Sequence, residues 1–229
     1  MKRVGVVIFP GSNCDRETVR AFAGNGAFEV VEVWHNASLP TGLDLVVLPG
    51  GWSYGDTLRA GTIARFARVM NGIVTYARDG GLVMGICNGF QVLTEAGLLP
   101  GALARNASLR FRCEVATCRI ESCHSPFTRA IAPGTVMPLP IAHGEGRFVA
   151  DEETLDLLEG DGMIALRYCN ASGNFTSSSN PNGSLRGIAG IVNRTGNIFG
   201  LMPHPERRCH PLLGGCEGAP LLFSWADGG

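Results

Sequence analysis

Apolar residues in the first hundred positions form four short, nearly continuous runs. They cover residues 4–9, 28–34, 45–48 and 82–86. The run over 4–9 is continuous, which is typical of a strand that is buried on both faces of a parallel sheet. The pattern therefore predicts four strands in this half of the chain.

Segments with helical spacing separate these runs. One helix is predicted from residue 14 or 15 to residue 23, and an apolar stripe through Ile63, Phe66, Ala67 and Ile73 predicts another. The resulting β-α-β-β-α-β succession indicates an α/β fold with a doubly wound, mostly parallel open sheet and flanking helices. Functional loops of such a sheet lie beyond the carboxyl ends of its strands, where residues 10–13, 49–56 and Cys87 fall.

The second half of the chain has a different pattern. Between about residues 105 and 149, short β-like runs alternate with proline and glycine, which predicts a β-rich middle segment with antiparallel strands. The remaining expectations are a helix over 151–159, a strand over 164–168, a polar loop over 170–184, a hairpin of 188–192 with 198–202, and a terminal helix over 218–226. No linker divides the chain, so a single domain over residues 1–229 is expected.

The composition of the chain argues against some classes of function. The chain has 229 residues, 45% of them apolar, and a formal net charge of −1, so no strong field favours nucleic acid or anionic lipid. The N-terminus lacks a signal-peptide pattern, and no apolar segment reaches transmembrane length. We therefore expect a cytoplasmic protein that binds neither membrane nor nucleic acid.

The eight cysteines do not indicate a disulfide framework, because the chain is large and lacks a secretion signal. A metal site is the alternative for Cys113, Cys118, Cys123 and His124. The chain contains no C-x-x-C pair, and spacings of five put successive cysteines on opposite faces of a strand. The sequence therefore predicts no metal site.

Cys87 is the strongest candidate for chemistry. It stands at a Gly-x-Cys-x-Gly corner between a predicted strand and a predicted helix, the arrangement of a nucleophile elbow with sulfur as the nucleophile. Small flanking residues allow a sharp turn, and a helix N-terminus favours the thiolate. Cys14 also lies between a strand and a helix and is the rival nucleophile, but it lacks a following glycine and has Asp15 beside it.

A nucleophilic cysteine requires a base and a group that orients the base. Two His-x-Glu pairs qualify, namely His204 with Glu206 and His143 with Glu145. The prolines around His204 suit a rigid catalytic segment, whereas the glycines around His143 suit a loop that yields to a ligand or partner. Local chemistry favours His204 and leaves His143 as the alternative.

Together these motifs resemble the class I glutamine amidotransferases, and within them the glutaminase subunits of phosphoribosylformylglycinamidine synthase. The matching segments span nearly the whole chain in order: residues 9–15, 48–56, 58–61, 85–91, 140–147, 180–184 and 200–207. Trp52, where phenylalanine is more usual, and the high cysteine content are small departures. Neither departure affects the candidate catalytic residues.

The resemblance implies that Cys87, His204 and Glu206 form a catalytic triad that hydrolyses L-glutamine through a thioester. Backbone N–H groups of Gly51 and Asn88 are the candidate oxyanion donors, and Gln91 is a candidate substrate-binding residue. The resemblance also implies that the segment from His143 to Arg147, which includes Glu145, belongs to a substrate loop or to an interface.

The resemblance also implies partners. Ammonia would pass to a large synthetase subunit that binds ATP and Mg²⁺, with a small accessory subunit in the same complex. This chain has no Walker motif, which agrees with ATP chemistry on the partner and no cofactor here.

Three alternatives remain open at this point. The chain could be a class I glutaminase subunit for a different acceptor, a stand-alone cysteine hydrolase, or a catalytically silent scaffold subunit. A silent scaffold would leave Cys87 no more reactive than Cys14 or Cys209.

Overall fold

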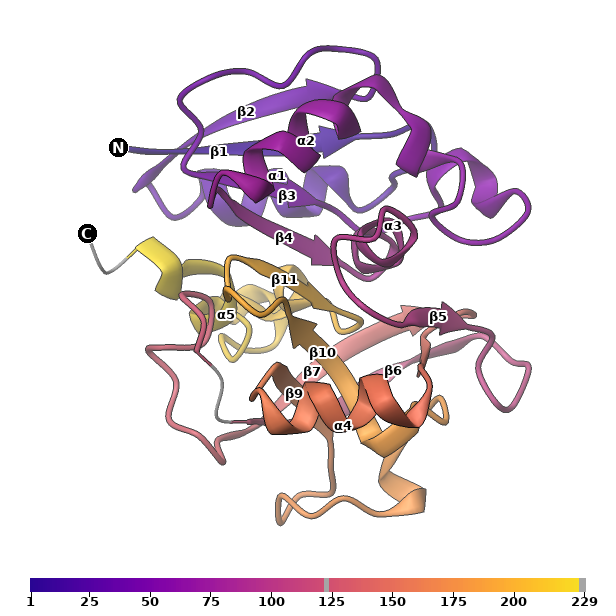
Figure 1. Ribbon diagram of the computed structural model, residues 1–229. Helices are drawn as coiled ribbons and strands as arrows, with labels where there is room; N and C mark the ends of the chain where they lie inside the picture. Colours follow the sequence, from indigo (N-terminus) through magenta and orange to yellow (C-terminus); the bar gives the residue numbers. More distant parts are fainter. Residues whose placement is uncertain (122–123, 227–229) are drawn as a thin grey trace.

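The main feature of the structure, a computed structural model, is a nine-stranded twisted sheet (Figure 1). The structure describes residues 1–121 and 124–226, and Cys123, considered above as a metal ligand, lies outside these residues. The strands of this sheet are β1 (Lys2–Ile8), β2 (Phe28–Trp34), β3 (Leu45–Leu48), β4 (Leu82–Ile86), β6 (Arg112–Ile120), β7 (Val136–His143), β9 (Ile164–Tyr168), β10 (Ile188–Val192) and β11 (Ile198–Leu201). Their order across the sheet is β2-β1-β3-β4-β11-β10-β9-β6-β7.

One half of this sheet is parallel. The pairs β1–β2, β1–β3, β3–β4 and β4–β11 are all parallel, so the carboxyl ends of these strands meet at one edge. All four residues of β3 are buried, as are all four of β11, because helices cover both faces of this half. The predicted α/β fold with a doubly wound parallel sheet is therefore confirmed for this half of the molecule.

The other half is antiparallel and comes mostly from the middle of the chain. The pairs β10–β11, β9–β10, β6–β9 and β6–β7 are antiparallel, so the predicted β-rich middle segment extends the main sheet. β7 is an edge strand, which explains why it tolerates Pro138 and Pro140. A separate two-stranded sheet pairs β5 (Ala102–Ala104) with β8 (Arg147–Val149).

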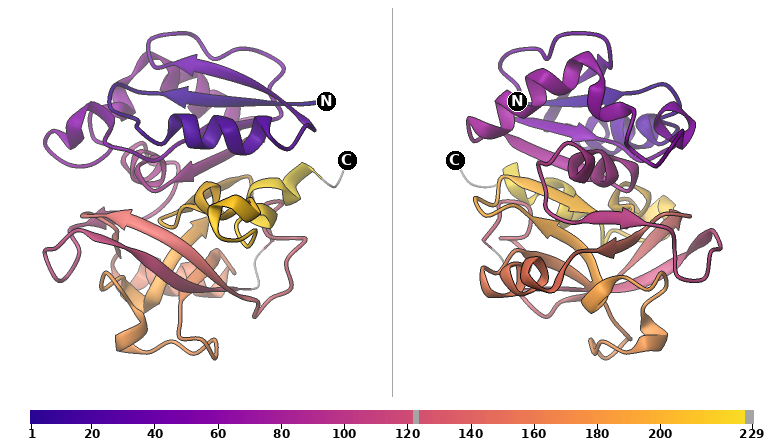
Figure 2. Two further views of the ribbon diagram at one scale, coloured as in Figure 1. Left: turned by 180° about the vertical axis from the view of Figure 1, so that it is seen from behind. Right: turned by 45° about the vertical axis from the view of Figure 1, so that its right-hand side comes forward.

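Helices pack on both sides of the sheet. The α-helices are α1 (Asp15–Ala23), α2 (Arg68–Arg78), α3 (Asn88–Glu95), α4 (Glu152–Gly160) and α5 (Ala219–Phe223). α2 lies in front of the parallel strands in Figure 1, whereas α1 lies in front when the molecule is turned round in Figure 2. In the described residues no helix combines the length and the hydropathy needed to cross a lipid bilayer.

Short 3₁₀ turns complete the chain. They are η1 (Ser53–Asp56), η2 (Ala64–Phe66), η3 (Ser177–Ser179), η4 (Leu185–Gly187), η5 (Pro205–Arg208), η6 (Pro211–Leu213) and η7 (Ser224–Ala226). The predicted hairpin is present as β10 and β11, and the predicted terminal helix is α5 continued by η7. The predicted polar loop over 170–184 contains η3 and also buries Asn182 and Ser184.

The prediction of one helix that includes both Phe66 and Ile73 is wrong. Ala67 has an extended backbone, so α2 begins only at Arg68, after the separate turn η2. Phe66 is therefore exposed rather than part of the buried stripe, and the guanidinium of Arg65 lies 4.4 Å from the centre of its ring. The helical spacing of apolar residues continues through Ala67, so the sequence pattern does not predict the break in the backbone there.

Candidate active site

The candidate residues come from loops that follow three adjacent strands. Gly51 follows β3, Cys87 follows β4 and His204 follows β11, and β4 lies between the other two strands. Because these strands are parallel, their carboxyl ends converge at one edge of the sheet. The backbone N–H of Cys87 also donates to the Leu201 carbonyl at 2.7 Å, which fixes β4 against β11 at the site.

Cys87 occupies a strained corner. Its φ of 49° and ψ of −103° lie in a region that L-residues with side chains rarely adopt, and it immediately precedes α3. Both flanking glycines are required. A Cβ on Gly89 would lie 1.9 Å from the Leu48 carbonyl oxygen, and one on Gly85 would lie 2.7 Å from the backbone of Gly89. The geometry is that of a nucleophile elbow.

His204 and Glu206 form a buried pair. The Nδ1 atom of His204 lies 2.6 Å from Oε1 of Glu206, and Pro205 fixes the backbone between them in η5. Burial opposes a charge on His204, but interactions with the Glu206 carboxylate and with the Cys87 sulfur outweigh it and raise the pKa of His204 from 6.5 to about 10. Among the described residues, neither Nε2 of His204 nor Oε2 of Glu206 has a hydrogen-bond partner. The arrangement favours an imidazolium beside the cysteine.

The edge strand β7 positions both groups. Its Pro140 carbonyl accepts a hydrogen bond from the His204 N–H at 2.7 Å. Two residues further along, the Ala142 carbonyl accepts from the Cys87 thiol, with 3.7 Å between sulfur and oxygen. Alternate carbonyls of one extended strand therefore hold the nucleophile and the histidine at a fixed spacing.

Two backbone N–H groups are suited to an oxyanion. Gly51 has a φ of 135°, and a Cβ there would lie 2.6 Å from the Asn13 nitrogen, so the position requires glycine. The N–H of Asn88 is the first of α3 and has no acceptor within that helix. In the described part of the chain, neither N–H donates a backbone hydrogen bond outside helices and strands.

Gln91 connects α3 to the turn after β7. Its Oε1 accepts from the Asn88 side chain at 2.8 Å, and its Nε2 donates to the Glu145 carbonyl at 2.5 Å. The Asn88 side chain also donates to Asp56 and accepts from the Ser53 N–H. Burial first, and then the charge of Glu145, raise the pKa of Asp56 to about 6.

The His143–Glu145 pair is not formed. The Nδ1 atom of His143 lies 3.1 Å from Oδ1 of Asn106, while the Glu145 carboxylate accepts from the Ala60 N–H and lies 3.9 Å from Arg105. Burial first, and then the positive charge of His204, lower the pKa of His143 to about 4. His143 is therefore neutral, and the alternative base from the sequence lacks its carboxylate.

Arg147 begins β8 and lies opposite Ala104. Of the hydrogen bonds and ion pairs between described residues, none joins Arg147 to the residues around Cys87, and its buried Nε has no partner there. The structure therefore brings together Cys87, His204 and Glu206, with Asn88 and Gln91 on α3 and Gly51 after the neighbouring strand β3, and no hydrogen bond or ion pair of the described residues joins Arg147 to them.

Asn106 is a residue that the sequence analysis missed. It is fully buried, and its Nδ2 donates to the carbonyls of His143 and Arg110, each at 2.9 Å. Its Oδ1 accepts from the Gly146 N–H and faces the His143 ring. One asparagine in a loop carries no periodic signal, so only the fold shows that it organises the 143–146 turn.

Cys14 lies beside the His204–Glu206 pair. Its sulfur, a ring nitrogen of His204 and a carboxylate oxygen of Glu206 lie within 4.8 Å of one another. Burial raises the pKa of Cys14 to about 12 despite the Arg207 guanidinium, whose Nη2 lies 3.1 Å from the sulfur. This geometry disfavours Cys14 as a nucleophile, and the adjacent guanidinium opposes a metal cation there.

Comparisons with known proteins identify the family. A family model described as a CobB/CobQ-like glutamine amidotransferase domain matches residues 1–214. The PurQ subunit of phosphoribosylformylglycinamidine synthase from Moorella thermoacetica is 51% identical over 225 residues, covering 98% of this chain and 95% of that protein. The PurQ subunit from Salinibacter ruber is 52% identical over 221 residues, with 96% and 94% coverage.

A solved structure agrees with these relatives. A chain in the structure of PurLQS from Thermotoga maritima is 41% identical and superimposes with a TM-score of 0.86, covering 99% of this chain and 98% of that one. This chain therefore belongs to the CobB/CobQ-like glutamine amidotransferases and, within them, to the PurQ family of phosphoribosylformylglycinamidine synthase subunits.

Proposed function

We propose that this chain is the glutaminase subunit of a phosphoribosylformylglycinamidine synthase. The observation that carries the proposal is the buried group of Cys87, His204 and Glu206, in a chain about half identical to PurQ subunits along nearly its whole length. A thiol nucleophile, a base and a carboxylate that orients the base are the groups that carboxamide hydrolysis requires. The carboxamide is the side chain of L-glutamine.

The first half-reaction forms a thioester. The Cys87 sulfur attacks the amide carbon of glutamine, and the carbonyl electron pair moves to oxygen. The resulting oxyanion accepts hydrogen bonds from the backbone N–H groups of Gly51 and Asn88. His204 then donates a proton to the amide nitrogen, the C–N bond breaks and ammonia leaves. Loss of one oxyanion donor would cost about 3 kcal/mol, or roughly a hundredfold in rate.

The second half-reaction regenerates the enzyme. Neutral His204 takes a proton from water, the resulting hydroxide attacks the thioester carbon, and glutamate leaves as the C–S bond breaks. Glu206 holds the ring of His204 in one orientation through both steps and stabilises its charged form. Gln91, which is bonded to the Glu145 carbonyl, is our candidate for contact with the substrate.

Ammonia is used by a partner. We assign ATP and Mg²⁺ to a large synthetase subunit that converts formylglycinamide ribonucleotide to the amidine, with a small accessory subunit in the same complex. The likeness to a chain of the PurLQS structure supports this assignment. The chain itself needs no cofactor for glutamine hydrolysis, and we expect the complex in the cytoplasm.

The covalent intermediate provides the test. The chain would be mixed with glutamine, quenched in acid and analysed by intact-mass and peptide mass spectrometry. We expect a γ-glutamyl adduct on Cys87 in the wild type and in Cys14→Ser, and no adduct in Cys87→Ala. An adduct that persists in Cys87→Ala, or that maps to Cys14, would refute the assigned nucleophile.

A further inference from the structure

Cys209 and Cys216 lie on the two arms of one short hairpin-like segment, residues 208–218. The segment leaves η5, makes the turn η6 and returns to the start of α5. His210 and Gly215 form an antiparallel bridge within it, so the backbone runs out and back. Cys209 precedes the bridge and Cys216 follows it, which makes the two cysteines the next opposed pair.

A second closure lies on the other side of the two cysteines. The Arg208 guanidinium donates to both carboxylate oxygens of Glu217, at 2.8 and 3.3 Å, and the Gly218 N–H donates to the Arg208 carbonyl at 2.8 Å. The two arms are therefore held together on both sides of the cysteine pair. Opposed residues of antiparallel chains have Cα atoms about 4.5–5.5 Å apart, which is within the range of about 4.4–6.8 Å found in disulfides.

The two cysteine side chains leave the segment on the same face. Arg208 and Glu217 meet on one face, and a Cβ on Gly215 would lie 2.8 Å from the Arg208 Nε, so position 215 shares that face. Successive side chains of an extended chain alternate between faces. Cys209 and Cys216 therefore both lie on the opposite face, where their sulfurs can meet.

The two thiols differ in exposure. Cys216 is exposed, whereas Cys209 is half-buried and its thiol donates to the Glu206 carbonyl, with 3.3 Å between sulfur and oxygen. Burial first, and then the charges of Glu206 and Cys216, raise the pKa of Cys209, so the two sulfurs lie close enough to interact. A reagent in solvent therefore reaches Cys216 first, and Cys209 is in place to react second.

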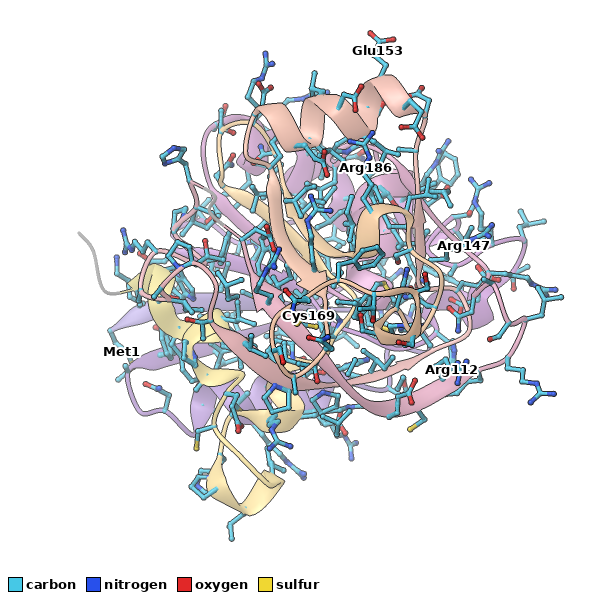
Figure 3. The ribbon with its side chains drawn as sticks, turned by 90° about the horizontal axis from the view of Figure 1, so that it is seen from below. Met1, Arg112, Arg147, Glu153, Cys169 and Arg186 are labelled. Carbon is cyan, nitrogen blue, oxygen red and sulfur yellow. The ribbon has the colours of Figure 1, made fainter. Side chains whose placement is uncertain are left out.

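The 208–218 segment projects from the body of the molecule. In Figure 3 it belongs to the pale-yellow chain at the lower left, away from the labelled Arg112. Leu212, in the turn between the two cysteines, is 90% exposed. Solvent therefore surrounds the tip of the segment, and a small reagent has access to it.

We propose that Cys209 and Cys216 form a reversible dithiol site that a low-molecular-weight disulfide oxidises. The Cys216 sulfur attacks one sulfur of the reagent, the S–S bond of the reagent breaks, and one thiol leaves with the proton that Cys216 loses. The Cys209 sulfur then attacks the Cys216 sulfur, displaces the second thiol with its own proton and closes the disulfide. Two electrons and two protons pass from the cysteines to the reagent, which becomes two thiols.

The disulfide at this site would be transient. We expect the complex in the cytoplasm, where thiols keep most disulfides reduced, so the state of the pair would follow the ratio of oxidised to reduced thiols around it. Oxidation would also remove the thiol donor from the Glu206 carbonyl, because a disulfide sulfur carries no hydrogen. Glu206 faces His204, so the dithiol site lies one hydrogen bond from the candidate triad.

The experiment compares single cysteine substitutions in the whole chain. Wild type, Cys209→Ser, Cys216→Ser and Cys113→Ser would be equilibrated at several ratios of reduced to oxidised glutathione and trapped with an alkylating reagent. Cys113 is the matched control, because it is exposed but lies opposite Ala142 in the sheet. Thermal unfolding of each variant would establish that it is folded.

Peptide mass spectrometry provides the readout. Trypsin cuts after Arg208 and releases both cysteines on one peptide, since no lysine or arginine follows in the chain. A closed disulfide leaves this peptide two hydrogen atoms lighter and without an alkyl group on either cysteine. A thiol that has only exchanged with the reagent carries glutathione instead.

We expect the closed disulfide in the wild type and in Cys113→Ser, and its loss when reduced glutathione is in excess. Cys209→Ser should instead keep glutathione on Cys216. Half-oxidation of the pair should need at least about tenfold less oxidised glutathione than half-modification of Cys113, because the second thiol is held beside the first.

Three results would overturn the proposal. They are alkylation of both cysteines in the folded wild type at every ratio, a bond from Cys216 to another cysteine or another chain, and equal sensitivity of the pair and of Cys113 to oxidised glutathione.

The outcome is separable from that of the proposed function, since the peptide masses require no glutamine hydrolysis. A closed disulfide in a chain that supports no glutamine-dependent synthesis would overturn the function and keep the dithiol site. Synthesis by a chain whose two cysteines always remain alkylated would do the reverse.

Discussion

His204 and His143 each stand two residues before a glutamate, but their imidazoles have different partners. His204 faces Glu206 at 2.6 Å, whereas His143 faces Asn106 at 3.1 Å. The pKa of His204 is raised to about 10, because charge from Glu206 and Cys87 outweighs burial. The pKa of His143 is lowered to about 4, because burial and the charge of His204 act together.

The backbone accounts for the difference. Pro205 and the 3₁₀ turn η5 bring the side chains of His204 and Glu206 together. His143 ends a strand instead, and the turn that follows carries Glu145 toward the Ala60 N–H. Spacing in the sequence permits an acid–base pair, and only the local backbone decides whether the pair forms.

Exchange of each glutamate for glutamine tests the comparison most strongly. Glu206→Gln removes the charge that orients and stabilises the His204 imidazolium, so kcat for glutamine hydrolysis should fall on the order of 10³-fold or more with KM little changed. Glu145→Gln should lower kcat by less than about tenfold, because its carboxylate does not contact a histidine. Steady-state kinetics of both variants would check this, and equal losses of kcat would contradict the comparison.

The histidines should also have opposite effects on stability as pH changes. His143 has a folded-state pKa of about 4 against an ordinary 6.5, so the unfolded chain binds the proton first as pH falls. Stability should decrease from about pH 6.5 to pH 4, by about 3 kcal/mol at the lower end. His204 changes stability in the opposite direction. Its contribution to the free energy of unfolding is fully present below pH 6.5 and is lost as pH rises through about 10.

Chemical denaturation between pH 4 and 7 would measure this effect. His143→Gln should flatten the acid limb of the stability curve, whereas His210→Gln, at an exposed histidine, should leave it unchanged. An acid limb with the same slope in His143→Gln would show that His143 is not the group that titrates.

The sequence was sufficient where backbone geometry depends on residues close in the chain. Gly85 and Gly89 on either side of Cys87 predict the strained corner, and the apolar runs predict the strands of the parallel half. The bounds of α1 agree with the predicted helix within one residue, because its period and flanking turn residues are local signals.

The sequence was insufficient where contacts join distant segments. The bonds of Asn106 to the 143–146 turn span about forty residues of chain and leave no periodic trace. The pairing of β6 with β9, which adds the middle segment to the main sheet, is equally non-local. The stripe through Phe66 predicted a helix where the extended backbone of Ala67 prevents one.

Cys14→Ser is expected to have the smallest effect. The pKa of Cys14 is raised to about 12, so its sulfur remains a thiol at neutral pH and is a poor nucleophile. Glutaminase activity should stay within about threefold of the wild type, because the substitution preserves a small polar group beside Arg207. A folded but inactive Cys14→Ser would instead make Cys14 part of the chemistry.

The most direct measurement is amide transfer to formylglycinamide ribonucleotide by the reconstituted complex with ATP. Wild type and Cys87→Ala would each be supplied with glutamine or with ammonium salt. We expect Cys87→Ala to lose glutamine-dependent synthesis and to keep ammonia-dependent synthesis at the wild-type rate, because the acceptor site lies on the partner. Glutamine-dependent synthesis by Cys87→Ala, or none by the wild type while ammonia is still accepted, would contradict the account.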